Sequence, residues 1–120
     1  MIKRIVIAGC RNYDNYEEAK TFIDSCLYET QKSHTIIILS GCAKGADAIG
    51  ERYASENGFD IEKYPADWKS LGRRAGPVRN KQMAEICDFV ICFWDGKSKG
   101  TASMIFYAKK FRKLLRIKKI

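Results

Sequence analysis

The stretch Leu39-Ser-Gly-Cys-Ala-Lys-Gly-Ala-Asp47 joins an apolar run, Thr35 to Leu39, to a segment in which apolar residues have helical spacing. We therefore expect a turn between a buried strand and a helix. Gly41 and Gly45 allow the backbone to turn sharply and to approach a bound group closely. Because the free N–H groups and the positive dipole end of the helix point into such a turn, it is suited to hold an anion, most often a phosphate. The alternative is a tight connection that uses glycine for its geometry alone.

The composition indicates one compact domain over residues 1–120, because 120 residues with 46% hydrophobic content suffice for one core but not for two. The apolar runs have the length of strands, and the N-terminus lacks the features of a signal peptide. These features predict a soluble, cytoplasmic protein with no membrane association. The five cysteines have no metal-ligand spacing and only one histidine accompanies them, so we expect free thiols and no metal. At Cys42 we expect a small buried side chain, with a reactive thiol as the alternative.

The net charge of +8 is concentrated at the C-terminal end. Residues 109–119 contain seven basic side chains and no acidic one, whereas the remaining 15 basic residues nearly balance 14 acidic residues. Such a basic segment can hold RNA or DNA phosphates without sequence preference. A solvated helix end and terminus explains the same charges, so nucleic acid is a second-rank partner.

Apolar patterning predicts alternating strands and helices along the whole chain. Strands are expected over residues 3–9, 35–40, 59–64, 88–94 and 114–117. Helices are expected over residues 15–30, from the glycine turn to Asn57-Gly58, over 77–87 and over 101–111. Asp14 with Glu17, or Asn15 with Glu18, has capping-box spacing at the start of the first helix. The alternation predicts an α/β fold with a parallel sheet, helices on both faces and right-handed crossovers.

This topology places the unusual loops at one edge of the sheet. In an open parallel sheet, ligands bind at the carboxyl ends of the strands. The loops expected there are Gly9-Cys-Arg11, residues 41–47, residues 66–80 and residues 95–101. Residues 65–76 are polar and irregular, and Pro77 follows where the first turn of a helix tolerates it. The chemistry of the protein is therefore expected at this edge.

Arg79 and Asn80 lie one helical turn before Met83 and are expected to face apolar contacts. A guanidinium in that position needs an anionic partner, which a phosphate bound bidentately would supply. Asn80 can donate to and accept from a ribose or a base. The alternative is a salt bridge from Arg79 to Asp47 or Asp67.

Several of these segments together resemble a known family. The segments are Ser40–Asp47, Tyr64–Trp68, Gly76–Asn80 and Gly100–Ala102, after an opening Gly9–Arg11. They look like the YspA-type branch, related to YpsA, of the SLOG superfamily, which includes the Lonely Guy phosphoribohydrolases and DprA. The resemblance implies a Rossmann-like three-layer α/β/α sandwich with a five-stranded, mainly parallel sheet in the order 3-2-1-4-5. It also implies a nucleotide or nucleotide-derived ligand and, by analogy, a homodimer.

The resemblance is less complete for catalysis. In the hydrolase branch the turn after the fourth strand reads Gly-Gly-x-Gly-Thr-x-x-Glu, and its glutamate acts with an arginine. Here Gly100 and Thr101 match, but Met104 occupies the glutamate position, and a thioether cannot transfer a proton. Arg79 best matches the arginine. Asp47 is then the leading substitute for the acid, unless it only complements the helix dipole and caps free N–H groups.

Three functions follow from these interpretations. The first is a sensor or processing domain that binds a nucleotide with no required cofactor, the second hydrolyses a nucleotide at its N-glycosidic bond, and the third is a DprA-like single-strand binder that uses residues 109–119. Asp47 and Arg79 would be the catalytic pair of the second. In the first, Trp68 would stack on a base, unless it is core or half-buried. The predicted ligand-binding residues are Gly9, Arg11, Gly41, Lys44, Gly45, Asp47, Asp67, Trp68, Gly76, Arg79, Asn80, Gly100 and Thr101.

Overall fold

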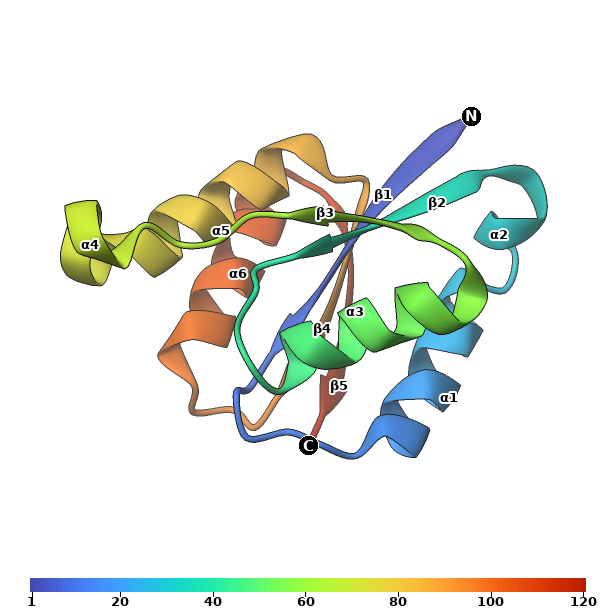
Figure 1. Ribbon diagram of the computed structural model, residues 1–120, viewed down its shortest axis with the longest axis horizontal. Helices are drawn as coiled ribbons and strands as arrows, with labels where there is room; N and C mark the ends of the chain where they lie inside the picture. The colour runs from blue at the N-terminus through green and yellow to red at the C-terminus, as the bar shows by residue number, and fades with distance from the viewer.

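The computed structural model describes all 120 residues, and its sheet has five parallel strands in the order β3-β2-β1-β4-β5 (Figure 1). The strands are β1 (Ile2–Gly9), β2 (Thr35–Ser40), β3 (Asp60–Lys63), β4 (Phe89–Trp94) and β5 (Leu114–Lys119). The strand β1 is central, because Val6 pairs with Leu39 of β2 on one side and Val90 of β4 on the other. The predicted α/β class and strand order are confirmed.

Helices cover both faces of this sheet. They are α1 (Tyr16–Leu27), α2 (Thr30–Ser33), α3 (Ala46–Asn57), α4 (Trp68–Leu71), α5 (Ala75–Ile86) and α6 (Lys99–Lys110), with a 3-10 helix over Gly72–Arg74. In Figure 1, α1 and α3 lie on one face and α5 and α6 on the other, so the molecule has three layers. No helix combines the length and the apolar character needed to cross a membrane.

Alternate residues of the central strands fill two separate cores. In β1, Ile5 and Ile7 pack with residues of α1 and α3, whereas Val6 and Ala8 pack with residues of α5 and α6. All four side chains are buried. Because helices cover both faces, a central strand is apolar at every position rather than at alternate positions. This explains the continuous apolar runs that predict the strands.

The first helix is shorter than predicted. Asn15 caps it, since its side-chain oxygen accepts a hydrogen bond from the Glu18 backbone N–H at 3.2 Å. The helix predicted over 15–30 ends at Leu27, its last buried residue, and a separate turn, α2, follows. Tyr28 is 58% exposed, so beyond Leu27 no burial holds the helix against the sheet.

The segment predicted to be irregular, residues 65–76, contains a short helix and a 3-10 turn before α5 begins at Ala75. Asp67 caps α4, because its Oδ1 accepts a hydrogen bond from the Ser70 backbone N–H at 3.1 Å. A four-residue helix is too short to show apolar periodicity, which is why the sequence pattern did not reveal it.

Candidate functional site

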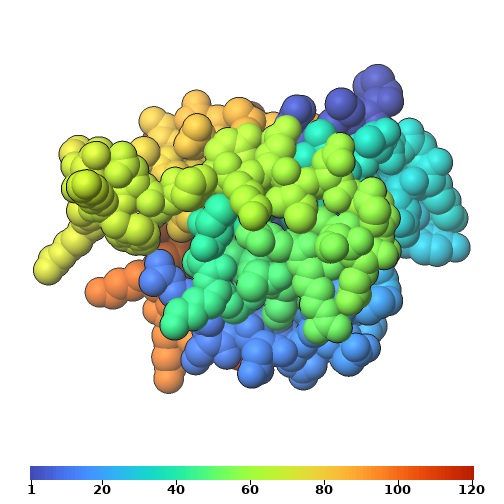
Figure 2. Space-filling model, viewed as in Figure 1, coloured from blue at the N-terminus to red at the C-terminus, as the bar shows by residue number.

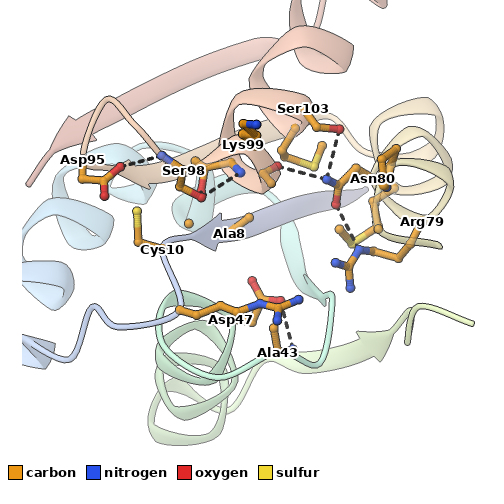
Figure 3. A pocket seen from close by; sticks show the side chains of 18 of the residues that line it. Ala8, Cys10, Ala43, Asp47, Arg79, Asn80, Asp95, Ser98, Lys99 and Ser103 are labelled. Carbon is orange, nitrogen blue, oxygen red and sulfur yellow. Dashed lines mark hydrogen bonds between the residues drawn. The ribbon is translucent and has the colours of Figure 1, made fainter. Parts of the chain in front are cut away.

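A cleft of about 540 Å³ opens at the carboxyl ends of β1 and β4. Its walls come from the end of β1, the first turns of α3 and α6, and the segment from α4 to α5 (Figure 3). In Figure 2 the surface is indented beside the protruding yellow-green α4 segment. The volume is within the range of small-molecule sites, and the location is the one expected for ligands of open parallel sheets.

The cleft brings together most of the predicted ligand-binding residues, namely Gly9, Arg11, Asp47, Trp68, Gly76, Arg79, Asn80, Gly100 and Thr101. Gly41 and Lys44 instead line a second hollow, of about 350 Å³, that adjoins the cleft. Gly45 and Asp67 line neither cavity. Loops from four strand ends therefore meet as predicted, but they form two compartments rather than one.

Gly45 is needed for packing inside the protein. Its φ is +74°, and a Cβ at this position would collide with the backbone carbonyl oxygens of Cys10 and Arg11. The Ala46 backbone N–H, the first of α3, donates a hydrogen bond of 3.1 Å to the Cys10 carbonyl. A carbonyl of the loop after β1 thus accepts a hydrogen bond from an amide that was expected to be free to bind an anion. Gly45 therefore fits the alternative expected from the sequence, a tight connection that uses glycine for its geometry alone.

Arg79 reaches from α5 to the glycine turn, where its Nη1 donates to the Gly41 carbonyl. Its Nε donates to Asn80 Oδ1 at 3.0 Å. The guanidinium forms no ion pair with Asp47 or Asp67, which were the alternative partners expected from the sequence. Burial lowers the pKa of Arg79, and the nearby Asp47 opposes this effect. The remaining N–H groups of the guanidinium have no partner and can bind an anion.

Asn80 links α5 to α6. Its side chain is 6% exposed, accepts from Arg79, and donates from Nδ2 to the Gly100 carbonyl at 3.2 Å. A second donor contact from Nδ2 reaches Ser103 Oγ at 3.4 Å. These contacts use both ends of the amide, which was expected to contact a ribose or a base. Asn80 therefore links the Arg79 side chain to the first turns of α6.

Asp47 is a buried carboxylate at the wall of the cleft and is 6% exposed. Its Oδ2 accepts a hydrogen bond of 3.1 Å from the Ala43 backbone N–H, which belongs to the glycine turn and not to α3. The carboxylate therefore closes the turn instead of capping the helix. Burial raises the pKa of Asp47 to about 6, although the Ala43 amide and the Arg79 charge act in the opposite direction. A carboxyl group with this pKa can exchange a proton near neutral pH.

We expect Asp47→Asn to remove a pH dependence of stability. Because the folded-state pKa of about 6 lies above the ordinary aspartate value of 3.8, the folded protein binds the proton more tightly than the unfolded chain. The free energy of unfolding should thus fall as the pH rises from about 4 to about 6. The variant should be more stable than the wild type at pH 7 by up to about 3 kcal/mol. Urea unfolding between pH 4 and pH 7 measures this difference, with the exposed Asp60→Asn as control. An unchanged slope in Asp47→Asn would contradict it.

The turn from β4 into α6 forms the opposite wall of the cleft. Asp95 Oδ1 accepts from the backbone N–H groups of Lys97 and Ser98, both at 2.8 Å, and these bonds lower the pKa of Asp95. Ser98 caps α6, with its Oγ accepting from the Thr101 N–H at 3.4 Å. The N–H groups of Lys99 and Gly100 have no partner within the helix, so the positive end of α6 faces the cleft.

Positive charge predominates in the cleft. The basic lining residues are Arg11, Arg73, Arg79 and Lys99, against the carboxylates Asp47 and Asp95. Trp68 is 49% exposed, and its ring centroid lies 5.7 Å from the Arg11 guanidinium carbon. Gly76 lies beside this indole, since a Cβ there would be 3.2 Å from Trp68. The arrangement offers an anion several donors and offers a flat ring a partly exposed aromatic face.

A comparison with known protein families places this geometry in context. The family described as "YspA, cpYpsA-related SLOG family" matches residues 3–70. The chain belongs to this SLOG family. The Gene 61 protein of Mycobacterium phage D29 is 31% identical to this SLOG protein over 116 residues, which cover 91% of the chain and 90% of the phage protein.

Solved structures share the fold of this SLOG protein at lower identity. DNA processing protein A from Helicobacter pylori, which binds single-stranded DNA, is 23% identical with a TM-score of 0.67, over 96% of this chain and 64% of that one. DprA from Streptococcus pneumoniae is 21% identical with a TM-score of 0.70, over 98% of this chain and 50% of that one. TM1055 is 17% identical with a TM-score of 0.67, over 96% of this chain and 72% of that one. The SLOG protein thus spans about half to two thirds of the DprA chains.

The structure adds cleft residues that the sequence did not predict, and it also corrects the expectation for Cys42. Met104 is 1% exposed and lines the cleft, so the thioether stands in the wall where the hydrolase pattern has a carboxylate. Arg73, Ser98 and Lys99 were missed, although a serine three residues before Thr101 is a helix-cap signal. The expectation of a buried Cys42 is wrong, because this residue has a φ of +66° and is exposed. The left-handed backbone turns its side chain outward.

Proposed function

We propose that this SLOG domain binds a nucleotide or nucleotide-derived ligand in the cleft, as a sensor or a nucleotide-processing domain. The observation that carries the proposal is the convergence of four basic side chains, the N-terminus of α6 and a half-exposed tryptophan around one cavity. A phosphate would lie between the free N–H groups of Arg79 and the first turn of α6. The base would stack on Trp68, and Lys99 would contribute charge at the rim.

Native mass spectrometry of the purified protein tests the proposal, followed by titration calorimetry with nucleoside mono-, di- and triphosphates. We expect a bound nucleotide to be recovered intact, or at least one member of the panel to bind with a stoichiometry of one per chain. If no nucleotide is recovered with the protein and no member of the panel binds at low ionic strength, the proposal fails.

A second candidate is hydrolysis of a nucleotide at its N-glycosidic bond, favoured by the pKa of about 6 for Asp47 beside the cleft. Water would add across the bond between sugar and base, releasing the free base and the sugar phosphate. Asp47 would move the proton that Met104 cannot move. Chromatography of a nucleoside monophosphate incubated with the protein should then show free base, and Asp47→Asn should stop its release. Release at an unchanged rate in this variant would assign the reaction to another group.

A third candidate is single-strand binding by the basic segment 109–119, suggested by the DNA-binding DprA of the same fold. This segment is built into the fold, because residues 114–119 form the edge strand β5. Lys113 Nζ donates to the Glu85 and Cys87 carbonyls at 3.2 and 2.7 Å, so it caps the end of α5. Deleting the segment would remove a strand, and a test must neutralise exposed charges instead.

We expect the combined variant Lys109→Gln, Lys110→Gln, Arg116→Gln and Lys119→Gln to bind single-stranded DNA like the wild type if the cleft is the binding site. All four side chains are exposed. If the basic segment binds DNA, the slope of log affinity against log salt should fall by about 0.7 for each phosphate that the variant no longer neutralises. Fluorescence anisotropy with a labelled oligonucleotide over a salt series measures both quantities. A shallower slope would favour the third candidate over the first.

A further inference from the structure

The second hollow, which we call the side hollow, adjoins the cleft between the glycine turn and the chain after β3. Its lining includes Gly41 and Lys44, and it shares Arg11, Ala43, Trp68 and Arg79 with the cleft. At about 350 Å³ it is itself within the size range of small-molecule sites. The two cavities therefore meet across four shared residues.

The side hollow is more uniformly positive than the cleft. Arg11, Lys44 and Arg79 line it and no carboxylate does, whereas Asp47 and Asp95 line the cleft. None of these three basic side chains forms a salt bridge within the protein. Unpaired positive charges in a concave surface concentrate the field and attract an anion.

Arg79 connects the two compartments through its hydrogen bonds. Its Nη1 donates to the Gly41 carbonyl, which belongs to the side hollow, and its Nε donates to Asn80, which lines the cleft. The guanidinium is thus fixed in the wall between the compartments, with N–H groups left over for anions. The Arg11 and Trp68 pair stands at the same boundary.

We infer that the ligand carries two phosphate groups separated by a nucleoside, one in the cleft at α6 and the other in the side hollow at Lys44. This inference rests on the proposed function and names its ligand class. A nucleoside 3′,5′-bisphosphate and a 5′-phosphorylated dinucleotide with a 3′,5′ linkage have this property. A dinucleotide with a 5′,5′-pyrophosphate linkage carries two adjacent phosphates with no nucleoside between them. A nucleoside monophosphate fills only one compartment.

Titration calorimetry with these four ligands tests the inference. We expect the wild type to bind a ligand with two separated phosphates at least about tenfold more tightly than the monophosphate, as a charge-assisted hydrogen bond provides. Preference for the bisphosphate and the 3′,5′-linked dinucleotide would identify a 3′ phosphate in the side hollow. Preference for the pyrophosphate compound over both of these ligands would contradict the inference, because its two phosphates are adjacent.

Matched lysine variants separate the compartments. Lys44→Gln should weaken the two-phosphate ligand about threefold more than the monophosphate, since an exposed charge contributes at this level. Lys99→Gln should weaken both ligands equally. Lys3→Gln, at the opposite end of β1, controls for net charge. The inference fails, while the proposed function stands, if the wild type binds ligands with one and two phosphates with equal affinity. The same holds if Lys44→Gln lowers the affinity for both kinds of ligand equally. Absence of binding by all four ligands removes the proposed function as well.

Discussion

Replacing Arg79 with alanine is expected to lower the affinity for the bound nucleotide by about 10- to 150-fold, the range for removing hydrogen bonds to a charged group. The half-buried guanidinium lies in the wall of both cavities and retains unpaired N–H groups. No other basic side chain lines both cavities while being anchored by two hydrogen bonds. Titration calorimetry with the tightest nucleotide of the panel measures the loss.

Two further variants make this result interpretable. Arg79→Lys keeps the charge but loses the planar fork, so it should recover only part of the affinity. Arg74→Ala removes an exposed arginine that lines neither cavity, and it should bind like the wild type. Thermal unfolding of each variant distinguishes lost binding from lost structure, because Arg79 also holds the Gly41 carbonyl. Wild-type affinity in a folded Arg79→Ala would remove Arg79 from the site.

Gly45→Ala is expected to lower the free energy of unfolding by about 4 kcal/mol, combining backbone strain with overpacking. The glycine has a φ of +74°, and a methyl group would collide with two carbonyl oxygens of the loop after β1. For a chain of this size the melting temperature should fall by about 15 °C. Thermal and urea unfolding measure the change.

Gly58→Ala is the control for a positive-φ glycine in open space. Its φ of +70° and ψ of 24° place it in the left-handed helical region, whereas the ψ of Gly45 is −126°, a combination that only glycine adopts readily. Nothing lies within 4 Å of the position that a Cβ at Gly58 would occupy. It should cost only about 1 kcal/mol, the cost of a left-handed residue alone. If Gly45→Ala were as stable as Gly58→Ala but lost nucleotide binding, Gly45 would serve the ligand and not the packing.

Local pattern predicted most of the elements because each strand and each long helix has its own apolar period. Residues 89–94 are apolar throughout, and the structure shows that β4 lies between β1 and β5 with helices on both faces. The apolar pattern did not predict α4, because this helix is too short to show a helical period. It also overestimated the length of α1, because burial ends at Leu27 although the following residues still favour a helix.

For the site, the sequence indicated which loops contribute, but it did not indicate that their residues line two separate cavities. Gly41 and Lys44 follow the same strand as Asp47, yet they line the side hollow while Asp47 lines the cleft. The side-chain amide of Asn80, which local reasoning left free for a ligand, is taken by Arg79 and Gly100. Both outcomes depend on side chains from distant segments, which no local pattern encodes.

By itself, the sequence determined the strands, the long helices and the edge of the sheet where the loops collect, because these follow from apolar spacing and from the rules of parallel sheets. The packing of the chain in three dimensions established that Gly45 lies against the loop after β1 and that burial raises the pKa of Asp47 to about 6. The same packing places Arg79 between two cavities. The physical reason is that burial, collision and hydrogen-bond partners are properties of atoms brought together from different parts of the chain.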